Sequence, residues 1–349
     1  MSEAIEMSSN QLAVPAEHQI ALSRLREYLA LPGEPDARLN PKWLAKRLGF
    51  GERELLGALA YAVREGLVEM HWEVYCVCGL SPAQYGSLRE AHSHVECGPC
   101  ETSFDLHLDR NVQVTFSATN RVRRESSGAS EPLPLKDDTE PATRGLDLLL
   151  VPAFWELFAG EAPAPDESLH IGRVAILFTD LKGSTAMYAE RGDPLAYRLV
   201  RDHFAILGEA IDRNQGALIK TIGDAVMASF ASGGDAVRAA FEAQEELHAR
   251  AEHMGGELII KAGVHAGACL GVTLNERLDF FGGAVNTAAR VQGLAHGDDV
   301  VITDAVIADL EAERLSEAPR FRVAESFDAA LRGLPTPVRV HRLLALPLS

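Results

Sequence analysis

The chain has 349 residues, a length that suggests two or three domains, and its composition of 47% hydrophobic and 24% charged residues is that of a folded protein. Its formal charge of −17 argues against a basic surface for a nucleic-acid backbone, and we expect no nucleic-acid partner. The longest apolar stretch, at 148–155, is interrupted by Pro152 and is too short to span a membrane. Because the first ten residues also lack a signal-peptide pattern, we expect a cytoplasmic protein with no membrane span.

The N-terminal residues are predicted to form a flexible leader followed by a small helical module. Residues 1–20 show no sustained hydrophobic period and are expected to be the leader. A proline at position 41 favours the start of a short helix, and four apolar residues at 55–63 share one face of a second helix. The order helix, turn, helix, strand over 41–70 resembles a winged-helix module. Its basic residues are interspersed with glutamates, which favours packing against protein over contact with DNA.

Four of the five cysteines form a cluster in the sequence, and in a reducing compartment such a cluster binds metal more often than it forms disulfides. They are Cys76, Cys78, Cys97 and Cys100. The second pair has the CxxC spacing of a zinc knuckle, and the first pair is one residue short of it. We expect a zinc-ribbon-like region at 71–118 with a structural Zn²⁺ on the four cysteines. Two alternatives stay open: His92 or His94, or less well His71, replaces a cysteine, or the ribbon is degenerate and is held by packing alone.

The second half of the chain has a different pattern, which follows a linker rich in Ser, Gly, Pro and acidic residues. We expect an N-terminal regulatory domain at 21–125, a linker and connector at 126–170 with a helix-like piece at 146–158, and a second domain at 171–349. Strands and helices are expected at 174–178, 194–214, 217–222, 225–230, 234–253 and 258–265. This β-α-β-β-α-β order is the ferredoxin-like, split βαβ arrangement of the α+β class.

Two aspartates are expected to meet in this second domain. Asp180 ends the first strand, and Asp224 lies at the tip of the hairpin that pairs beside it. Two neighbouring carboxylates repel each other unless cations lie between them, and Mg²⁺ bound by carboxylates and substrate phosphates is a common solution. The turn at 182–185 leads into a helix and offers backbone N–H groups for phosphate oxygens. Either aspartate alone is typical of an ordinary turn or helix cap, so the prediction depends on the pair.

Four ordered motifs in residues 171–349 resemble the catalytic domain of class III adenylate/guanylate cyclases. They read FTDLKGST, IKTIGDAVM, GVHAG and LDFFGGAVNTAAR, and they begin at Phe178, Ile219, Gly263 and Leu278. The first half resembles a bacterial, cyclase-associated N-terminal domain of unassigned function. One departure from the family pattern is Lys-Gly-Ser-Thr after Asp180, where many members have an aromatic residue before the threonine, and this leaves the subclass open.

The resemblance implies that two Mg²⁺ or Mn²⁺ ions bind in each active site. Their ligands would be Asp180, Asp224 and the carbonyl group of Leu181. The triphosphate would lie against the turn formed by Gly183, Ser184 and Thr185.

The resemblance also assigns the residues that handle the base, the ribose and the reacting phosphate. Lys220 and Asp279 would read the edge of adenine, because a donor and an acceptor in these places match adenine and mispair with guanine. Asn286 would position the ribose, and Arg290 would stabilise the charge that develops on the α-phosphate. Arg332 is a weaker match to a basic residue that binds the triphosphate.

The implied activity is that of an adenylate cyclase, which converts ATP into 3′,5′-cyclic AMP and pyrophosphate. In the family, the metal-binding and base-reading residues of one site come from opposite protomers. A chain that holds both sets is therefore expected to form a homodimer with shared active sites. The alternatives are a guanylate cyclase, a catalytically silent dimer that binds nucleotide and signals, and a zinc-dependent transcription factor, which the missing basic surface disfavours.

Overall fold

The computed structural model describes residues 14–31, 38–120, 122, 140–158, 160–251, 258–313 and 321–346. Contacts within the chain divide it into two compact units, of which the first comprises residues 1–69 and 116–141 and the second comprises residues 70–115 and 142–349. Two of the three boundaries between the units, at 69/70 and 115/116, fall within strands. The second unit therefore contains both the cysteine cluster and the entire cyclase-like half.

The first unit is mainly helical. It contains α1 (Ala16–Leu29), α2 (Pro41–Leu48) and α3 (Glu52–Arg64). The side chain of Asn40 caps α2 by accepting a hydrogen bond from the Lys42 amide, and Gly49 ends the helix in a left-handed conformation. Helix α1 starts inside the stretch expected to be a leader, because its buried leucines follow a helical period. The rest of that leader (1–13) and most of the expected linker (126–139) lie outside the described residues, and the winged-helix assignment stays a prediction.

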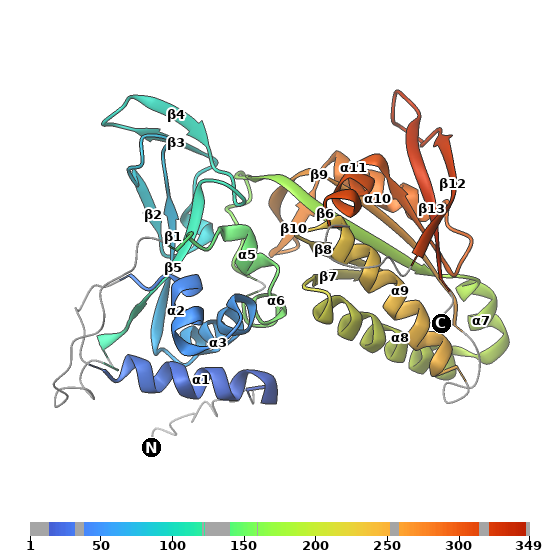
Figure 1. Ribbon diagram of the computed structural model, residues 1–349, viewed down its shortest axis with the longest axis horizontal. Coiled ribbons are helices and arrows are strands. Elements are labelled where there is room, and N and C mark those ends of the chain that lie inside the picture. Colours follow the sequence, from blue (N-terminus) through green and yellow to red (C-terminus); the bar gives the residue numbers. More distant parts are fainter. Residues whose placement is uncertain are drawn as a thin grey trace, which may run out of the picture. The chain divides into compact units, whose positions relative to one another are not determined.

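The cysteine-containing segment folds as short strands (Figure 1). These are β1 (Val68–Val74), β2 (Ala83–Tyr85), β3 (His94–Cys97), β4 (Thr102–Asp105) and β5 (Val112–Ala118), with a 3₁₀ turn at Leu88–Glu90. The strand order β2-β1-β5 makes one sheet, and β3 and β4 form a separate hairpin.

The connector before the cyclase-like half consists of two short helices rather than the single helical piece expected at 146–158. They are α5 (Gly145–Leu149) and α6 (Pro152–Leu157). The break occurs at Pro152, which lacks a backbone N–H and therefore starts a new helix instead of continuing the old one. Phe154 of α6 is completely buried, so this segment is part of the folded unit.

The cyclase-like half is built on one mixed sheet with the strand order β12-β13-β11-β9-β6-β8-β7, and β10 pairs with the far end of β9. Its strands are β6 (Leu169–Leu181), β7 (Ala217–Ile222), β8 (Ala225–Phe230), β9 (Ile260–Leu274), β10 (Arg277–Phe281), β11 (Asp299–Thr303), β12 (Phe321–Ala329) and β13 (Val338–Ala345). Its helices are α7 (Ser184–Arg191), α8 (Asp193–Arg213), α9 (Gly233–Ala249), α10 (Gly283–Gln292) and α11 (Asp304–Glu313).

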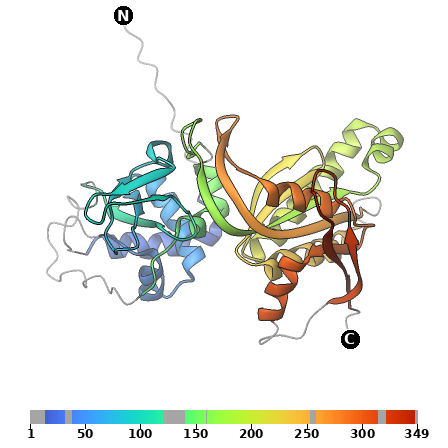
Figure 2. The ribbon, with the colours of Figure 1, turned by 90° about the horizontal axis from the view of Figure 1, so that it is seen from above.

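The predicted β-α-β-β-α-β order is confirmed, and the hairpin strands β7 and β8 have the predicted bounds. Strands β6 and β9 are much longer than predicted. They pair with each other along most of their lengths, and Figure 2 shows how strongly both curve. The buried core continues along β6 to Leu169 and Ile171, which explains why this strand starts earlier than the short apolar run suggested.

The helices of this half cover both faces of the sheet. Ala262 and Val264 of β9 belong to the same apolar core as the buried residues of α8 and α9. Gly263 lies between them and therefore faces the other side, where α10 packs against β9. A Cβ atom on Gly263 would lie 2.1 Å from the backbone nitrogen of Gln292, so only glycine permits this approach of α10. Helix α10 carries two of the predicted site residues, so its packing against β9 determines where these residues lie.

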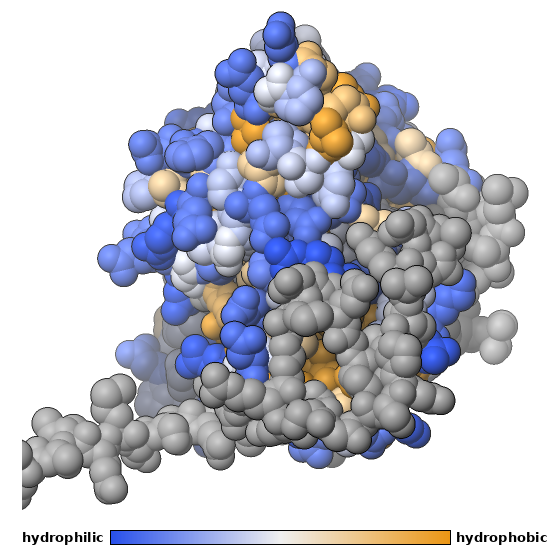
Figure 3. Space-filling model, turned by 90° about the vertical axis from the view of Figure 1, so that its left-hand side faces the viewer, coloured by the Kyte–Doolittle hydropathy of each residue, from blue (hydrophilic) through white to orange (hydrophobic). Residues whose placement is uncertain are grey.

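On the face drawn in Figure 3, hydrophilic side chains predominate and the hydrophobic groups form small separate patches. Among the described residues, no helix combines the length and the apolar character that a membrane crossing requires.

We expect Gly263→Ala to destabilise the protein by about 3 kcal/mol, because the added methyl group must displace the backbone of α10. The same variant should lose most of its catalytic activity. Gly208→Ala is the matched control. Gly208 lies inside α8 with no atom within 4 Å of an added Cβ, so this change should be neutral or stabilise by up to about 1 kcal/mol. Chemical denaturation measures both values, and equal stabilities of the two variants would contradict the packing argument.

Candidate active site

The two aspartates predicted to bind metal lie close together at one end of the sheet. Strand β6 pairs with β8, with Thr179 opposite Val226, so Asp180 and Asp224 follow directly at the end of this pairing. Burial raises the pKa of Asp180, and the nearby carboxylate of Asp224 raises it further. The structure thus brings together two negative groups that repel each other.

These carboxylates fit a divalent cation. The Oδ2 atom of Asp224 is buried and has no hydrogen-bond partner within the described part of the chain. A buried carboxylate oxygen without a partner is costly, and a bound cation would remove both this cost and the mutual repulsion. Hard oxygen ligands are those that Mg²⁺ and Mn²⁺ prefer.

The turn after Asp180 has the geometry expected for a phosphate site. Leu181 is the last residue of β6, and the amide of Lys182 donates to the carbonyl of Ile259 at 2.8 Å. Gly183 adopts a left-handed conformation with a φ of 75°, and α7 starts at Ser184. The first backbone N–H groups of a helix have no partner inside it, so those at Ser184 and Thr185 are suited to bind an anion.

Lys220 and Asp279, the predicted base-reading residues, form an ion pair. Strand β7 carries Lys220, strand β10 carries Asp279, and the Nζ atom of the lysine contacts Oδ2 of the aspartate. The Asp279 side chain is 11% exposed and the Lys220 side chain 33%. The amide of Phe280 donates to the other carboxylate oxygen of Asp279 at 2.7 Å, which orients this side chain. A donor and an acceptor are therefore held next to each other.

Helix α10 carries both residues predicted to act on the ribose and the α-phosphate. Asn286 is exposed, and Arg290 is half-buried one turn further along. The guanidinium of Arg290 approaches the turn that contains Arg332 and Gly333: its Nη2 atom lies 3.3 Å from the position of a Cβ built on Gly333. Arg332 itself is exposed. The structure thus places the turn that contains Arg332 next to Arg290. From the sequence alone, Arg332 was the weaker candidate for a residue that binds the triphosphate.

The predicted site residues are not joined in one network of hydrogen bonds and ion pairs within the described part of the chain. In the described part of the chain, no hydrogen bond or ion pair connects the Asp180–Asp224 pair with the Lys220–Asp279 pair or with the two residues of α10.

Two residues near the aspartates were missed by sequence reasoning. Lys261 on β9 is the cross-strand partner of Asp180 and lowers the pKa of that carboxyl, against the effects of burial and Asp224. Its signal was a lysine inside an otherwise apolar strand. His203 of α8 is completely buried, and burial lowers its pKa to about 4, so it is neutral at pH 7. In the sequence, His203 is a lone histidine on an apolar helix face, and this pattern does not indicate that it lies near the two aspartates.

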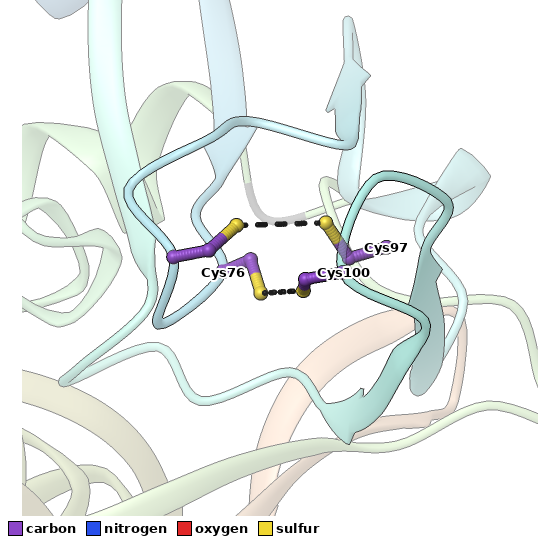
Figure 4. Close-up of side chains that lie close together, drawn as sticks. Cys76, Cys97 and Cys100 are labelled. Carbon is purple, nitrogen blue, oxygen red and sulfur yellow. Dashed lines mark hydrogen bonds between the residues drawn. The ribbon is translucent and has the colours of Figure 1, made fainter.

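The four predicted cysteines also come together. Their Sγ atoms all lie within 4.8 Å of one another, and two loops point them toward a common centre (Figure 4). The distance is 3.4 Å from Cys76 to Cys100 and 3.7 Å from Cys78 to Cys97, too long for disulfide bonds. Hydrogen bonding with the Thr102 side chain lowers the pKa of the Cys100 thiol to about 6, whereas burial raises that of Cys97 to about 12.

The histidines considered as replacement ligands have other partners. His92 contacts Glu167 at 3.1 Å, and His94 contacts Asp105 at 3.0 Å. The Nδ1 atom of His71 lies 3.3 Å from the side-chain amide of Gln84. The metal-ligand group found within the described residues consists of the four cysteines alone.

The fold, the paired aspartates and the donor–acceptor pair have the chemistry expected of a site for a nucleotide and divalent metal. Residues 167–343, slightly more than half of the chain, match the family described as "Adenylate and Guanylate cyclase catalytic domain". The chain therefore belongs to this family, whose members generally depend on divalent metal, bind nucleotide and act as dimers. Residues 20–141 match a family of unknown function, DUF5939.

Several curated proteins resemble the cyclase half of the chain. An adenylate cyclase of Anabaena cylindrica is 33% identical in an alignment 171 positions long, which covers 43% of this chain and 34% of that protein. An adenylate cyclase of Mycosarcoma maydis is 32% identical over 40% of this chain and 6% of its own length. A receptor-type adenylate cyclase of Trypanosoma brucei brucei, GRESAG 4.3, is 29% identical over 50% of this chain and 17% of its own length. The chain thus spans only about a third or less of these relatives.

Solved structures of cyclases are also similar. A structure of Trypanosoma brucei adenylate cyclase in its monomeric state has 26% sequence identity and a TM-score of 0.41, covering 49% of this chain and 89% of that one. The adenylyl cyclase CyaB from P. aeruginosa has 18% identity and a TM-score of 0.44, covering 52% and 97%.

Proposed function

We propose that this protein is an adenylate cyclase, which converts ATP into 3′,5′-cyclic AMP and pyrophosphate. The observation that carries the proposal is the ion pair between Lys220 and Asp279, in which the lysine can donate to the adenine ring nitrogen and the carboxylate can accept from the exocyclic amine. Guanine presents the opposite pattern and would leave both groups mispaired, which is costly at a buried site. The curated relatives named adenylate cyclase support the same choice.

The reaction joins the ribose 3′-oxygen to the α-phosphorus, breaks the bond from that phosphorus to the pyrophosphate oxygen, and releases the proton of the 3′-hydroxyl to solvent. Asp180 and Asp224, with the Leu181 carbonyl, would hold the divalent ions, two Mg²⁺ or Mn²⁺ per site. Such ions lower the pKa of the 3′-hydroxyl and neutralise the charge of the phosphates.

Residues of the chain bind and orient the substrate and stabilise the transition state. The amides at 183–185 bind phosphate oxygens, and Arg332 binds the triphosphate. Asn286 orients the ribose for attack in line with the leaving group. Arg290 stabilises the negative charge that develops at the α-phosphate in the transition state.

The active unit of the proposal is a homodimer with two shared sites. The aspartates of one protomer face the base-reading and α10 residues of the other, as the family resemblance implies. Residues 21–125 form the regulatory domain, linked by 126–170 to the catalytic domain at 171–349. Orienting the two catalytic domains would control both sites at once.

The proposal includes a structural zinc ion on the cysteine cluster. Four sulfurs about 2.3 Å from a tetrahedral Zn²⁺ are roughly 3.8 Å apart. The two measured Sγ–Sγ distances, 3.4 and 3.7 Å, come close to this value.

Base selection is tested by Lys220→Glu. The new carboxylate repels Asp279 and cannot donate to adenine, so kcat/KM for ATP should fall by at least about 100-fold and the preference for ATP over GTP should disappear. Assays with ATP and GTP side by side measure both values. Lys220→Met, of similar length and without charge, is the control and should lose activity with ATP without gaining any with GTP. An unchanged preference for ATP over GTP in Lys220→Glu would contradict the assignment of Lys220 to base reading.

Shared sites are tested by mixing two inactive variants. Asp224→Asn and Arg290→Ala should each lose more than about 99% of the activity, because one lacks a metal ligand and the other the transition-state cation. After dissociation and reassociation, half of the dimers are mixed, and each of these has one intact site. The mixture should therefore regain about a quarter of the parent activity. Asp224→Asn mixed with Asp180→Asn is the matched control and should stay inactive, since both changes affect the same half of a site. Equal results for the two mixtures would refute shared sites.

The zinc prediction is tested on purified protein. Elemental analysis should find one zinc per chain, and removing it with a chelator should lower the melting temperature by several degrees. Cys97→Ser should abolish zinc binding. Cys269→Ser, which changes the buried cysteine outside the cluster, should retain one zinc per chain. A parent protein without zinc whose stability does not depend on the metal would favour the degenerate ribbon.

A further inference from the structure

The connecting helix α6, which precedes the catalytic domain, lies against both strands that hold the base-reading pair. It packs on β7, which carries Lys220. Its Trp155 meets Phe280 of β10 edge to face, with ring centroids 6.0 Å apart and an interplanar angle of 75°. Phe280 is 1% exposed and directly follows Asp279.

Phe280 in turn orients the carboxylate of Asp279. Its backbone N–H donates to Oδ1 at 2.7 Å, while Oδ2 pairs with Lys220. The direction of the Oδ2 atom therefore depends on where the backbone of Phe280 lies. Because the Phe280 side chain has almost no free surface, the ring packed against it limits where that backbone can move.

Trp155 is itself held on two sides. Its Nε1–H donates to the carbonyl of Leu149 in α5 at 2.6 Å. The ring centroid of Phe154 lies 6.2 Å from that of Trp155 and 6.3 Å from that of Trp72 in β1. Phe154 and Trp72 are both completely buried. A chain of ring contacts thus runs from the sheet next to the cysteine cluster to the strand that carries Asp279.

We propose that Trp155 is a positioning residue for nucleotide selection, which acts through Phe280 on Asp279. The proposal rests on the base-reading role of Lys220 and Asp279 argued above. It places part of the adenine preference outside residues 167–343, the segment that matches the cyclase family. The connector is then part of the substrate site as well as a link between domains.

The test measures binding, so that it does not depend on turnover. Full-length protein is titrated with 3′-deoxy-ATP and 3′-deoxy-GTP, which lack the attacking oxygen, in the presence of Mn²⁺. Trp155→Leu keeps an apolar side chain and removes the ring. It should weaken 3′-deoxy-ATP binding about five- to tenfold and change 3′-deoxy-GTP binding less than about twofold. Trp155→Phe restores a ring and should recover most of the preference.

Phe158→Leu is the matched control. Phe158 follows α6, and its ring packs against Phe154 with the ring centroids 5.9 Å apart. This variant should lower the melting temperature as Trp155→Leu does, yet keep the parent ratio of the two dissociation constants. An unchanged ratio in Trp155→Leu, or an equal change in Phe158→Leu, overturns the proposal.

Failure of the proposed function would look different from failure of this inference. A parent protein that prefers 3′-deoxy-ATP but makes no cyclic AMP would contradict the cyclase activity, and the comparison of the Trp155 variants would still decide the positioning role. A parent protein with no preference between the two analogues would overturn both the base-reading assignment and this inference.

Discussion

The fold of the catalytic half holds two carboxylates near each other against their mutual repulsion: Asp180 near the end of β6 and Asp224 in the turn between β7 and β8. The pairing of β6 with β8 brings Asp180 beside Asp224, and one buried oxygen of Asp224 has no partner within the described chain. The unfavourable free energy of this arrangement is offset by packing elsewhere. This packing includes the core that α8 and α9 share with the sheet and the close approach of α10 to Gly263. Lys261 relieves the repulsion only in part. The cost makes sense if cations bind there during the reaction.

Much of this half could be predicted because its signals are local. The hairpin of β7 and β8 was predicted with its observed bounds, since Gly223-Asp224 forms a two-residue turn between two apolar runs. The long extensions of β6 and β9 could not be predicted, because their far ends are stabilised by pairing with each other and with β10. Lys220 and Asp279, 59 residues apart, were assigned to the same base only through the family resemblance, and the ion pair between them was not predicted.

The connector shows a different limit of sequence reasoning. An apolar run at 146–158 predicts a single helical piece. The break at Pro152 was missed, and the sequence pattern does not show what the second helix contacts. Trp155 carries no local signal that distinguishes a core aromatic from one that supports a substrate site. Its role becomes visible only when the fold places it against Phe280, next to Asp279.

The overall charge of −17 sets the final constraint on substrate binding. A strongly acidic protein repels a nucleoside triphosphate at long range, so its net field cannot bring the substrate to the site. Attraction must come from cations at short range, where a few well-placed groups outweigh a distant field that salt screens. In the proposed site these cations would be the metal ions on the two aspartates, Arg290 with the nearby Arg332 turn, and Lys220, which is paired with Asp279. In a shared site these groups come from two protomers, so a single chain would hold the triphosphate poorly. Dimerisation would then be required for substrate binding as well as for catalysis.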